Sequence, residues 1–143
     1  MDTAESLLKS KGHEIWSVHP DASVYDALVM MADKEAGALL VMENDELVGV
    51  ISERDYARKI ILKGKASKDT LVREIMTAKV ICVNIRTPVN ECMAIMTEKR
   101  IRHLPVFDGE QLVGVISIGD VVKDIISEQE FVIDQLEKYI IGR

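Results

Sequence analysis

The apolar positions of this chain follow a helical period in some stretches and form short continuous segments in others. Within residues 24–31 an apolar residue recurs at the i, i+3, i+4 and i+7 spacing, and the same spacing recurs within residues 89–96. This spacing places the apolar side chains on one face of an amphipathic helix. A short apolar segment precedes each helix, at 15–18 and at 80–83, and predicts a strand.

Pairs of apolar segments follow these helices, and short polar stretches separate the members of each pair. The polar stretches read ENDE at residues 43–46 and DGEQ at residues 108–111, which is a composition typical of hairpin turns. A further helix is expected to begin near Ser52 and near Ser117. The apolar segments predict strands at 38–42 paired with 47–51, and at 103–107 paired with 112–116.

Two features mark the beginnings of the amphipathic helices. Ser23 lies three residues before Asp26, which is the spacing of a capping box. Pro88 precedes the second apolar stripe and suits a first helical turn, where its missing N–H would have no partner. Both helices are therefore predicted to start close to these residues.

The chain contains one sequence unit twice. Residues 15–58 align with residues 80–123 without a gap, and 13 of the 44 aligned positions are identical. The identities include the run LVGVIS and the two aspartates Asp55 and Asp120. An ungapped match of this length indicates a duplicated unit.

Each unit has the predicted order β-α-β-β-α, so the fold class is α+β, with two units in pseudo-twofold tandem. One unit is too small to bury both faces of its sheet, so we expect the two to pack against each other. The polar linker between them carries one apolar anchor, formed by Leu71, Val72, Ile75 and Met76. The predicted organisation is an N-terminal helix at 1–11, a first domain at 12–62, a linker at 63–76, a second domain at 77–127 and a C-terminal helical extension at 128–143.

The last predicted element is a long helix over residues 120–141. It has more apolar surface than one small unit covers, so we expect a homodimer contact along it. Its apolar residues are Val121, Val122, Ile125, Ile126, Val132, Ile133, Leu136, Ile140 and Ile141.

Composition excludes several classes of function. The formal net charge is −6 and no run of Lys or Arg offsets it, so nucleic-acid binding is not expected. No apolar run is long enough to span a bilayer, and the beginning MDTAESLLKSKGHEI does not resemble a signal peptide. Cys82 and Cys92 have neither a disulfide framework nor zinc spacing, so no metal site is expected and the thiols are predicted to be reduced. A cytoplasmic location is therefore expected, with an organelle reached by a removed transit peptide as the alternative.

A serine followed by an aspartate three residues later begins the second helix of each unit, as Ser52 with Asp55 and as Ser117 with Asp120. One interpretation is a helix N-cap with a carboxylate at the third helical position. The other is ligand binding, because a helix N-terminus suits a phosphate and a nearby carboxylate accepts hydrogen bonds from the vicinal hydroxyls of a ribose. The two roles are compatible, so the spacing leaves both open.

The two units resemble the cystathionine-β-synthase (CBS) domain, and the pair resembles a Bateman module over roughly residues 12–127. The resemblance depends on G-V-I-S-x-x-D in both copies, RIRHLPV at 100–106 and VREIMT at 72–77. The segments ISERDYARKI and SIGDVV also resemble a group of stand-alone two-CBS proteins from bacteria and plant organelles. In this family such pairs bind adenine nucleotides or S-adenosylmethionine in clefts between the units, and usually regulate another protein.

The resemblance implies two candidate ligand sites that span the units. The first comprises Ser52, Arg54, Asp55, Thr77, Lys79, Val80, Ile81, Arg102 and His103. The second comprises Ile15, Trp16, Ser17, Gly114, Ser117 and Asp120. The second set lacks the cations of the first, so we expect it to be the weaker phosphate site. Gly49 and Gly114 are expected to let a ligand approach their strands closely.

The resulting functional hypothesis is a non-catalytic regulatory homodimer. Its ligand contains adenosine, with AMP expected first and ADP, ATP, NAD and S-adenosylmethionine as alternatives, and its bound state signals to a partner protein. No catalytic constellation and no P-loop occur in the sequence. The alternative hypothesis is a ligand-independent scaffold dimer that regulates an enzyme or a redox protein.

Overall fold

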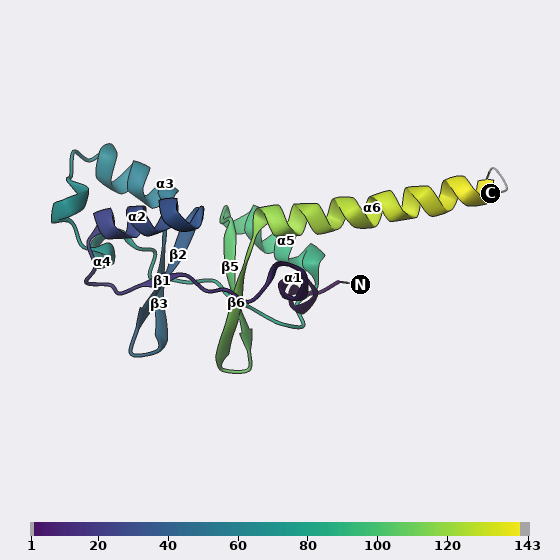
Figure 1. Ribbon diagram of the computed structural model, residues 1–143, viewed down its shortest axis with the longest axis horizontal. Coiled ribbons are helices and arrows are strands. Elements are labelled where there is room, and N and C mark those ends of the chain that lie inside the picture. The colour runs from purple at the N-terminus through teal and green to yellow at the C-terminus, as the bar shows by residue number, and fades with distance from the viewer. Residues whose placement is uncertain (1, 141–143) are drawn as a thin grey trace. The chain divides into compact units, whose positions relative to one another are not determined.

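The computed structural model describes residues 2–140, which form two compact units (Figure 1). The first unit is Ile15–Val80. The second unit contains the chain from Ile81 onward together with the N-terminal segment through Glu14. The leading helix, which was expected to be a separate element, is therefore part of the second unit.

The first unit contains one three-stranded sheet in the order β1-β2-β3. β1 runs parallel to β2, and β2 runs antiparallel to β3. After α3 the helix continues as one π-helical turn, and two short helices follow it. The elements are β1 (Ser17–Val18), α2 (Val24–Lys34), β2 (Ala38–Glu43), β3 (Glu46–Ser52), α3 (Glu53–Tyr56), η1 (Ala57–Ile61), η2 (Ser67–Asp69) and α4 (Val72–Ile75).

The second unit repeats this arrangement with the sheet order β4-β5-β6. β4 is parallel to β5, and β5 is antiparallel to β6. The predicted β-α-β-β-α order and the α+β class are therefore confirmed. The elements are α1 (Ala4–Lys11), β4 (Val83–Asn84), α5 (Val89–Lys99), β5 (His103–Asp108), β6 (Gln111–Ser117) and α6 (Ile118–Ile140).

The predicted helix stripes form the two cores. In the first unit, Val24, Ala27 and Met31 of α2 are buried against residues of β2 and β3. In the second unit, Val89, Cys92 and Met96 of α5 take the equivalent positions. The gapless repeat thus corresponds to two cores of the same design, because each identical apolar position fills the same place in its unit.

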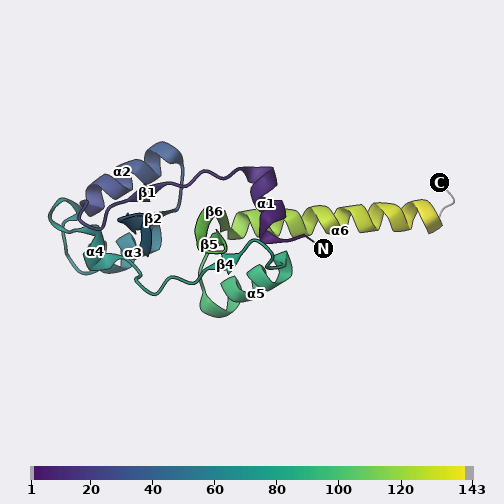
Figure 2. The same ribbon diagram turned by 90° about the horizontal axis from the view of Figure 1, so that it is seen from below.

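Each core is completed by a helix that lies outside the repeated segment. Leu7 and Leu8 of α1 are buried in the core of the second unit, where α1 contacts β6 and α6 (Figure 2). Val72 and Ile75 of α4 are buried in the core of the first unit. The linker and the N-terminal segment therefore each provide a helix that covers one side of a small sheet.

Two local expectations differ from the structure, and the cap expected at Ser23 is present. Leu71 is 39% exposed and does not anchor the linker, because α4 begins at the next residue and turns Val72 and Ile75 inward instead. Pro88 lies at the N-cap of α5 with an extended backbone (ψ 148°), one position before the helical turn in which it was expected. Ser23 caps α2 by accepting a hydrogen bond from the N–H of Asp26 at 3.0 Å.

Helix α6 is continuous across the boundary expected at residue 127 and extends well past α5 and α1 of its own unit (Figure 1). Several of its apolar residues are exposed, including Phe131, at 64%, and Ile133, at 56%. The side chain of Ile140, and Ile141 altogether, lie outside the described residues. Within residues 2–140, no helix has the length and apolar content needed to cross a membrane.

Candidate ligand-binding site

In the first unit, the Ser52–Asp55 motif closes the N-terminus of α3. The Asp55 N–H donates to the Ser52 Oγ at 3.2 Å, and the Ser52 N–H donates to the Asp55 Oδ2 at 3.0 Å. The Ser52 hydroxyl also donates to the same carboxylate oxygen at 3.1 Å. These reciprocal bonds form a capping box, so the capping interpretation is confirmed.

The second unit repeats this geometry at the N-terminus of α6. The Ser117 N–H donates to the Asp120 Oδ2 at 2.7 Å, and the Asp120 N–H donates to the Ser117 Oγ at 3.2 Å. Both serines pair with the first residue of the preceding strand, Ser52 with Ala38 and Ser117 with His103. Strand register and helix capping therefore fix both carboxylates at the same place in their units.

Each aspartate also has a lysine partner, and the two lysines come from different parts of the fold. Lys59 lies one helical turn after Asp55, and its Nζ is 3.3 Å from the Asp55 Oδ1. In the second unit, the Nζ of Lys11 in α1 lies 2.7 Å from the Asp120 Oδ2 and donates to the Val115 carbonyl at 2.9 Å. The motifs are alike in capping but differ in how their charge is balanced.

Neither lysine was predicted as a site residue. Lys59 was detectable, because the i, i+4 spacing from Asp55 places both side chains on one helix face. Lys11 carries no such signal, since 109 positions separate it from Asp120. The second predicted set contains no cation, but the fold of the second unit brings Lys11 from α1 to its aspartate.

The charges around Asp120 also shift two pKa values. Burial alone would raise the pKa of the Asp120 carboxyl, but the hydrogen bonds from Lys11 and Ser117 outweigh it, and the pKa lies below its ordinary value. Burial, followed by the positive charge of Lys11, lowers the pKa of the His103 imidazole, although Asp120 opposes this shift. At neutral pH Asp120 is therefore ionised, and His103 is an uncharged hydrogen-bonding group.

The remaining residues of the first predicted set divide between the units. Thr77 exchanges two backbone hydrogen bonds with Val50 on β3, at 2.8 and 3.0 Å, which places its segment beside the motif strand. Arg54, Lys79 and Val80 belong to the same unit as Asp55, with Lys79 exposed. Ile81, Arg102 and His103 belong to the second unit. Their convergence on one ligand stays a prediction.

The second predicted set is divided in the same way. Ile15, Trp16 and Ser17 belong to the first unit, and Gly114, Ser117 and Asp120 to the second. The Trp16 ring is 36% exposed and lies under the Lys34 Nζ at 4.5 Å from its centre, so Trp16 is not a core residue.

The two strand glycines are explained by packing. A Cβ at Gly114 would lie 2.6 Å from a methyl carbon of Leu8, and a Cβ at Gly49 would lie 2.6 Å from the Met76 sulfur. Side chains of α1 and of the segment after α4 thus occupy the space that was expected to admit a ligand. Close packing against the two strands accounts for both glycines.

One open hollow in the first unit was not predicted. It lies between the C-terminal part of α2 and α3, and two of its lining residues, Glu35 and Glu53, are acidic. Carboxylates repel phosphate, so this hollow does not suit an anionic ligand. It is lined by Leu28, Met31, Ala32, Glu35, Ala36, Gly37, Glu53 and Tyr56.

The thiols do not resemble redox centres. Cys92 is fully buried, and burial, with a smaller effect from the Glu91 charge, raises the pKa of its thiol to about 11. Burial also raises the pKa of Cys82. A thiol with a raised pKa is protonated at neutral pH and is a poor nucleophile.

Among the described residues, two clusters of His, Asp and Glu side chains have ligand atoms close enough together to hold a metal ion. His19, Asp21 and Glu43 form one, but Arg73 already lies within it, with its Nε donating to Asp21 at 2.7 Å. The other consists of Asp2, Asp124 and Glu128. Burial, followed by Asp2, raises the pKa of Asp124, as expected for carboxyl groups that repel one another.

Comparisons with known proteins agree with this architecture. The CBS domain family matches residues 12–62 and 72–127. The mitochondrial CBS domain-containing protein CBSX3 of Arabidopsis thaliana is 41% identical over 150 residues, which cover 98% of this chain and 72% of the plant protein. A crystal structure of a CBS domain is 48% identical with a TM-score of 0.84, and the match covers 87% of this chain and 98% of that one.

A further solved structure shares the fold alone. It is a CBS domain pair in complex with 5′-methylthioadenosine and S-adenosyl-L-methionine, with a TM-score of 0.79 at 22% identity, and the match covers 90% of this chain and 98% of that one. The family match spans most of the chain in two successive segments, and each segment contains one G-V-I-S-x-x-D motif. This chain belongs to the CBS domain family and carries a tandem pair of CBS domains.

Proposed function

We propose that this protein is a non-catalytic regulatory module that binds an adenosine-containing ligand through its Ser-x-x-Asp corners and transmits the bound state to a partner protein. The observation that carries the proposal is the duplicated capping box, which holds a carboxylate beside a helix N-terminus in both units. A carboxylate in this position accepts hydrogen bonds from ribose hydroxyls without having to be ordered first, so binding has a lower entropic cost.

The proposed ligand class follows from this chemistry and from the family. AMP is the first candidate, with ADP, ATP, NAD and S-adenosylmethionine as the others. The solved pair that holds 5′-methylthioadenosine and S-adenosyl-L-methionine supports an adenosine compound in general. In the proposed complexes one ligand binds to the first predicted set, around Asp55, and another binds to the second set, around Asp120. A cytoplasmic location is part of the proposal, and the mitochondrial plant relative makes an organelle the alternative.

Substitution of Asp55 or Asp120 by alanine is expected to weaken binding of AMP. Loss of hydrogen bonds to a charged acceptor costs roughly 1–3 kcal/mol, which corresponds to roughly a 5- to 150-fold rise in the dissociation constant. The measurement is calorimetric titration of the full chain, after a thermal-shift screen that selects the adenosine compound with the largest effect.

Ser23→Ala is the matched control for this experiment. Ser23 caps α2 in the same way, through the Asp26 N–H at 3.0 Å, but it belongs to neither ligand set. Its loss is expected to cost about 1 kcal/mol of stability and to leave affinity unchanged. If no adenosine compound raises the melting temperature of the wild type, the sensor function is wrong, and the scaffold dimer that regulates an enzyme or a redox protein takes its place.

We also propose that the exposed apolar face of α6 forms the contact of a homodimer. Ile126 and Ile133 lie two turns apart, with Val132 and Leu136 beside them, and all four are at least 49% exposed. A continuous apolar stripe of this length is typical of a helix that packs against another helix.

The substitution Ile133→Asp is expected to raise the dimer dissociation constant about tenfold or more, because it buries a charge in the contact. Ser127→Asp is the control, since it places the same charge on the side of α6 away from these four residues, where Ser127 is exposed. Sedimentation velocity across a concentration series measures the effect. A monomeric wild type, or equal effects of the two variants, would refute the α6 contact.

A further inference from the structure

The lysine at the end of α1 has an unusual position in the second unit. Its Nζ donates to the Asp120 Oδ2 at 2.7 Å and to the Val115 carbonyl at 2.9 Å. An ammonium group has three donors, and these two bonds leave one. The Lys11 side chain is 35% exposed, so its third N–H is accessible to a ligand that reaches Asp120.

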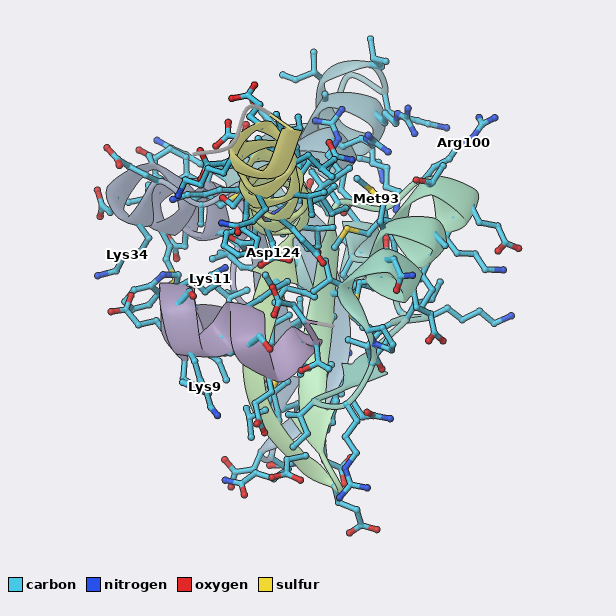
Figure 3. The ribbon with its side chains drawn as sticks, turned by 90° about the vertical axis from the view of Figure 1, so that its right-hand side faces the viewer. Lys9, Lys11, Lys34, Met93, Arg100 and Asp124 are labelled. Atoms are coloured by element: carbon cyan, nitrogen blue, oxygen red, sulfur yellow. The ribbon has the colours of Figure 1, made fainter. Side chains whose placement is uncertain are left out.

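The position of Lys11 is determined by the core and not by the lysine itself. Ala4, Leu7 and Leu8 are buried, and the backbone N–H of Ala4 donates to the Thr87 carbonyl at 2.9 Å. Lys11 lies one turn after Leu7 and is therefore brought to the same end of the sheet as the motif. Lys9, on the same helix, points to the other side of α1 and pairs with Glu5 at 3.4 Å (Figure 3).

Two cations act on His103 beside this corner, although the chain is acidic overall. Lys11, Asp120 and the exposed Arg102 all act electrostatically on His103, so these four residues form one cluster within the second unit. At neutral pH the cluster has two positive charges against one negative charge, in a protein of formal net charge −6. Locally positive potential of this kind favours an anionic group.

We propose that Lys11 makes the Ser117–Asp120 corner selective for ribosides that carry a negative charge, that is, for nucleoside phosphates over uncharged nucleosides and over cationic sulfonium nucleosides. The inference rests on the proposed function and specifies its ligand class at this corner. Asp120 accepts the ribose hydroxyls, and on its own it would repel a phosphate on the same sugar. Lys11 compensates the carboxylate and offers its third N–H to a phosphate oxygen.

The test is calorimetric titration of the full chain in the Asp55→Ala background, so that binding reports on the second corner. With Lys11 present, we expect AMP to bind more tightly than adenosine, and S-adenosylmethionine to bind more weakly than adenosine. Lys11→Met is expected to lower the affinity for AMP about tenfold and to change that for adenosine less than about twofold, as one charge-assisted bond is lost. Lys11→Arg is expected to restore most of the AMP affinity.

Lys9→Met is the matched control, because it removes the same charge from the same helix on the side away from Asp120, and it is expected to change neither affinity. If Lys11→Met lowers the affinities for AMP and for adenosine by equal factors, the inference is overturned, and Lys11 is a residue that only positions Asp120. Higher affinity of Lys11→Met for both ligands would also overturn it, because Lys11 would then be blocking the Asp120 carboxylate. In both cases the adenosine-binding function survives, whereas a wild type that binds no adenosine compound refutes both proposals.

Discussion

Replacing Leu8 by alanine is expected to lower the free energy of unfolding by about 2–5 kcal/mol, which is the usual cost of removing a fully buried leucine side chain. Leu8 is 0% exposed and lies in the core of the second unit, more than 70 residues before the β-strands that it covers. The change leaves a cavity between α1 and β6, because a Cβ on Gly114 of β6 would touch this side chain. Urea denaturation followed by far-UV circular dichroism measures the loss.

Leu62→Ala is the control for this experiment. Leu62 is 78% exposed, so its truncation is expected to change stability by less than about 0.5 kcal/mol. A loss at Leu8 no larger than that at Leu62 would mean that α1 does not contribute to the core of the second unit. The assignment of the N-terminal segment to that unit would then be wrong.

Gly114→Ala has the second large expected effect, a destabilisation of about 1–3 kcal/mol from overpacking. The added Cβ would lie 2.6 and 3.0 Å from the two methyl carbons of Leu8, and this buried side chain has little room to move. The double variant Leu8→Ala/Gly114→Ala is therefore expected to lose less free energy of unfolding than the two single variants lose together. Urea denaturation of the wild type, the two single variants and the double variant completes this double-mutant cycle.

Gly119→Ala is the matched control within the same segment. Its Cβ would meet only the Ser117 Oγ at 3.6 Å, which is an ordinary contact, and the position is helical. Alanine is favoured over glycine in a helix by up to about 1 kcal/mol, so this variant is expected to be neutral or slightly stabilised. Additive losses at Leu8 and Gly114 would show that the two positions are not in contact.

The Lys11 experiment and these two stability experiments depend on one feature, the attachment of α1 to the second unit. The burial of Leu8 fixes α1, and the end of α1 delivers Lys11 to Asp120. A substitution that loosens α1 is therefore expected to act on the second corner as well. Lys11→Arg separates the two effects, because it keeps the charge and leaves the buried residues of α1 unchanged.

The sequence predicted well those features that depend on neighbours in the chain. The stripe from Val24 to Met31 predicted α2, because helical periodicity is a local property. The polar stretch ENDE predicted the β2–β3 turn, in which Asn44 and Asp45 both have positive φ, at 52° and 62°. The Ser-x-x-Asp spacing predicted both capping boxes, since all of their bonds are made within three residues.

The sequence was less informative where residues distant in the chain determine the outcome. Leu71 was expected to be buried, but which side chains of the linker turn inward depends on where α4 begins. The segment before α2 sets that position, because the Val72 N–H donates to the Ala22 carbonyl at 2.8 Å. Gly114 was read as an opening for a ligand, since nothing in the strand sequence shows that Leu8 fills the space. Lys59 was overlooked although its spacing is local.

By itself, then, the sequence determined the repeated β-α-β-β-α unit, the family and the two Ser-x-x-Asp corners, because periodicity, turn chemistry and capping act over a few residues. Only the tertiary structure decided that the N-terminal segment completes the second unit and that Lys11 neutralises Asp120. The physical reason is that such contacts arise from burying apolar surface, which selects partners by shape across the whole chain and leaves no spacing that a reader of the sequence can recognise.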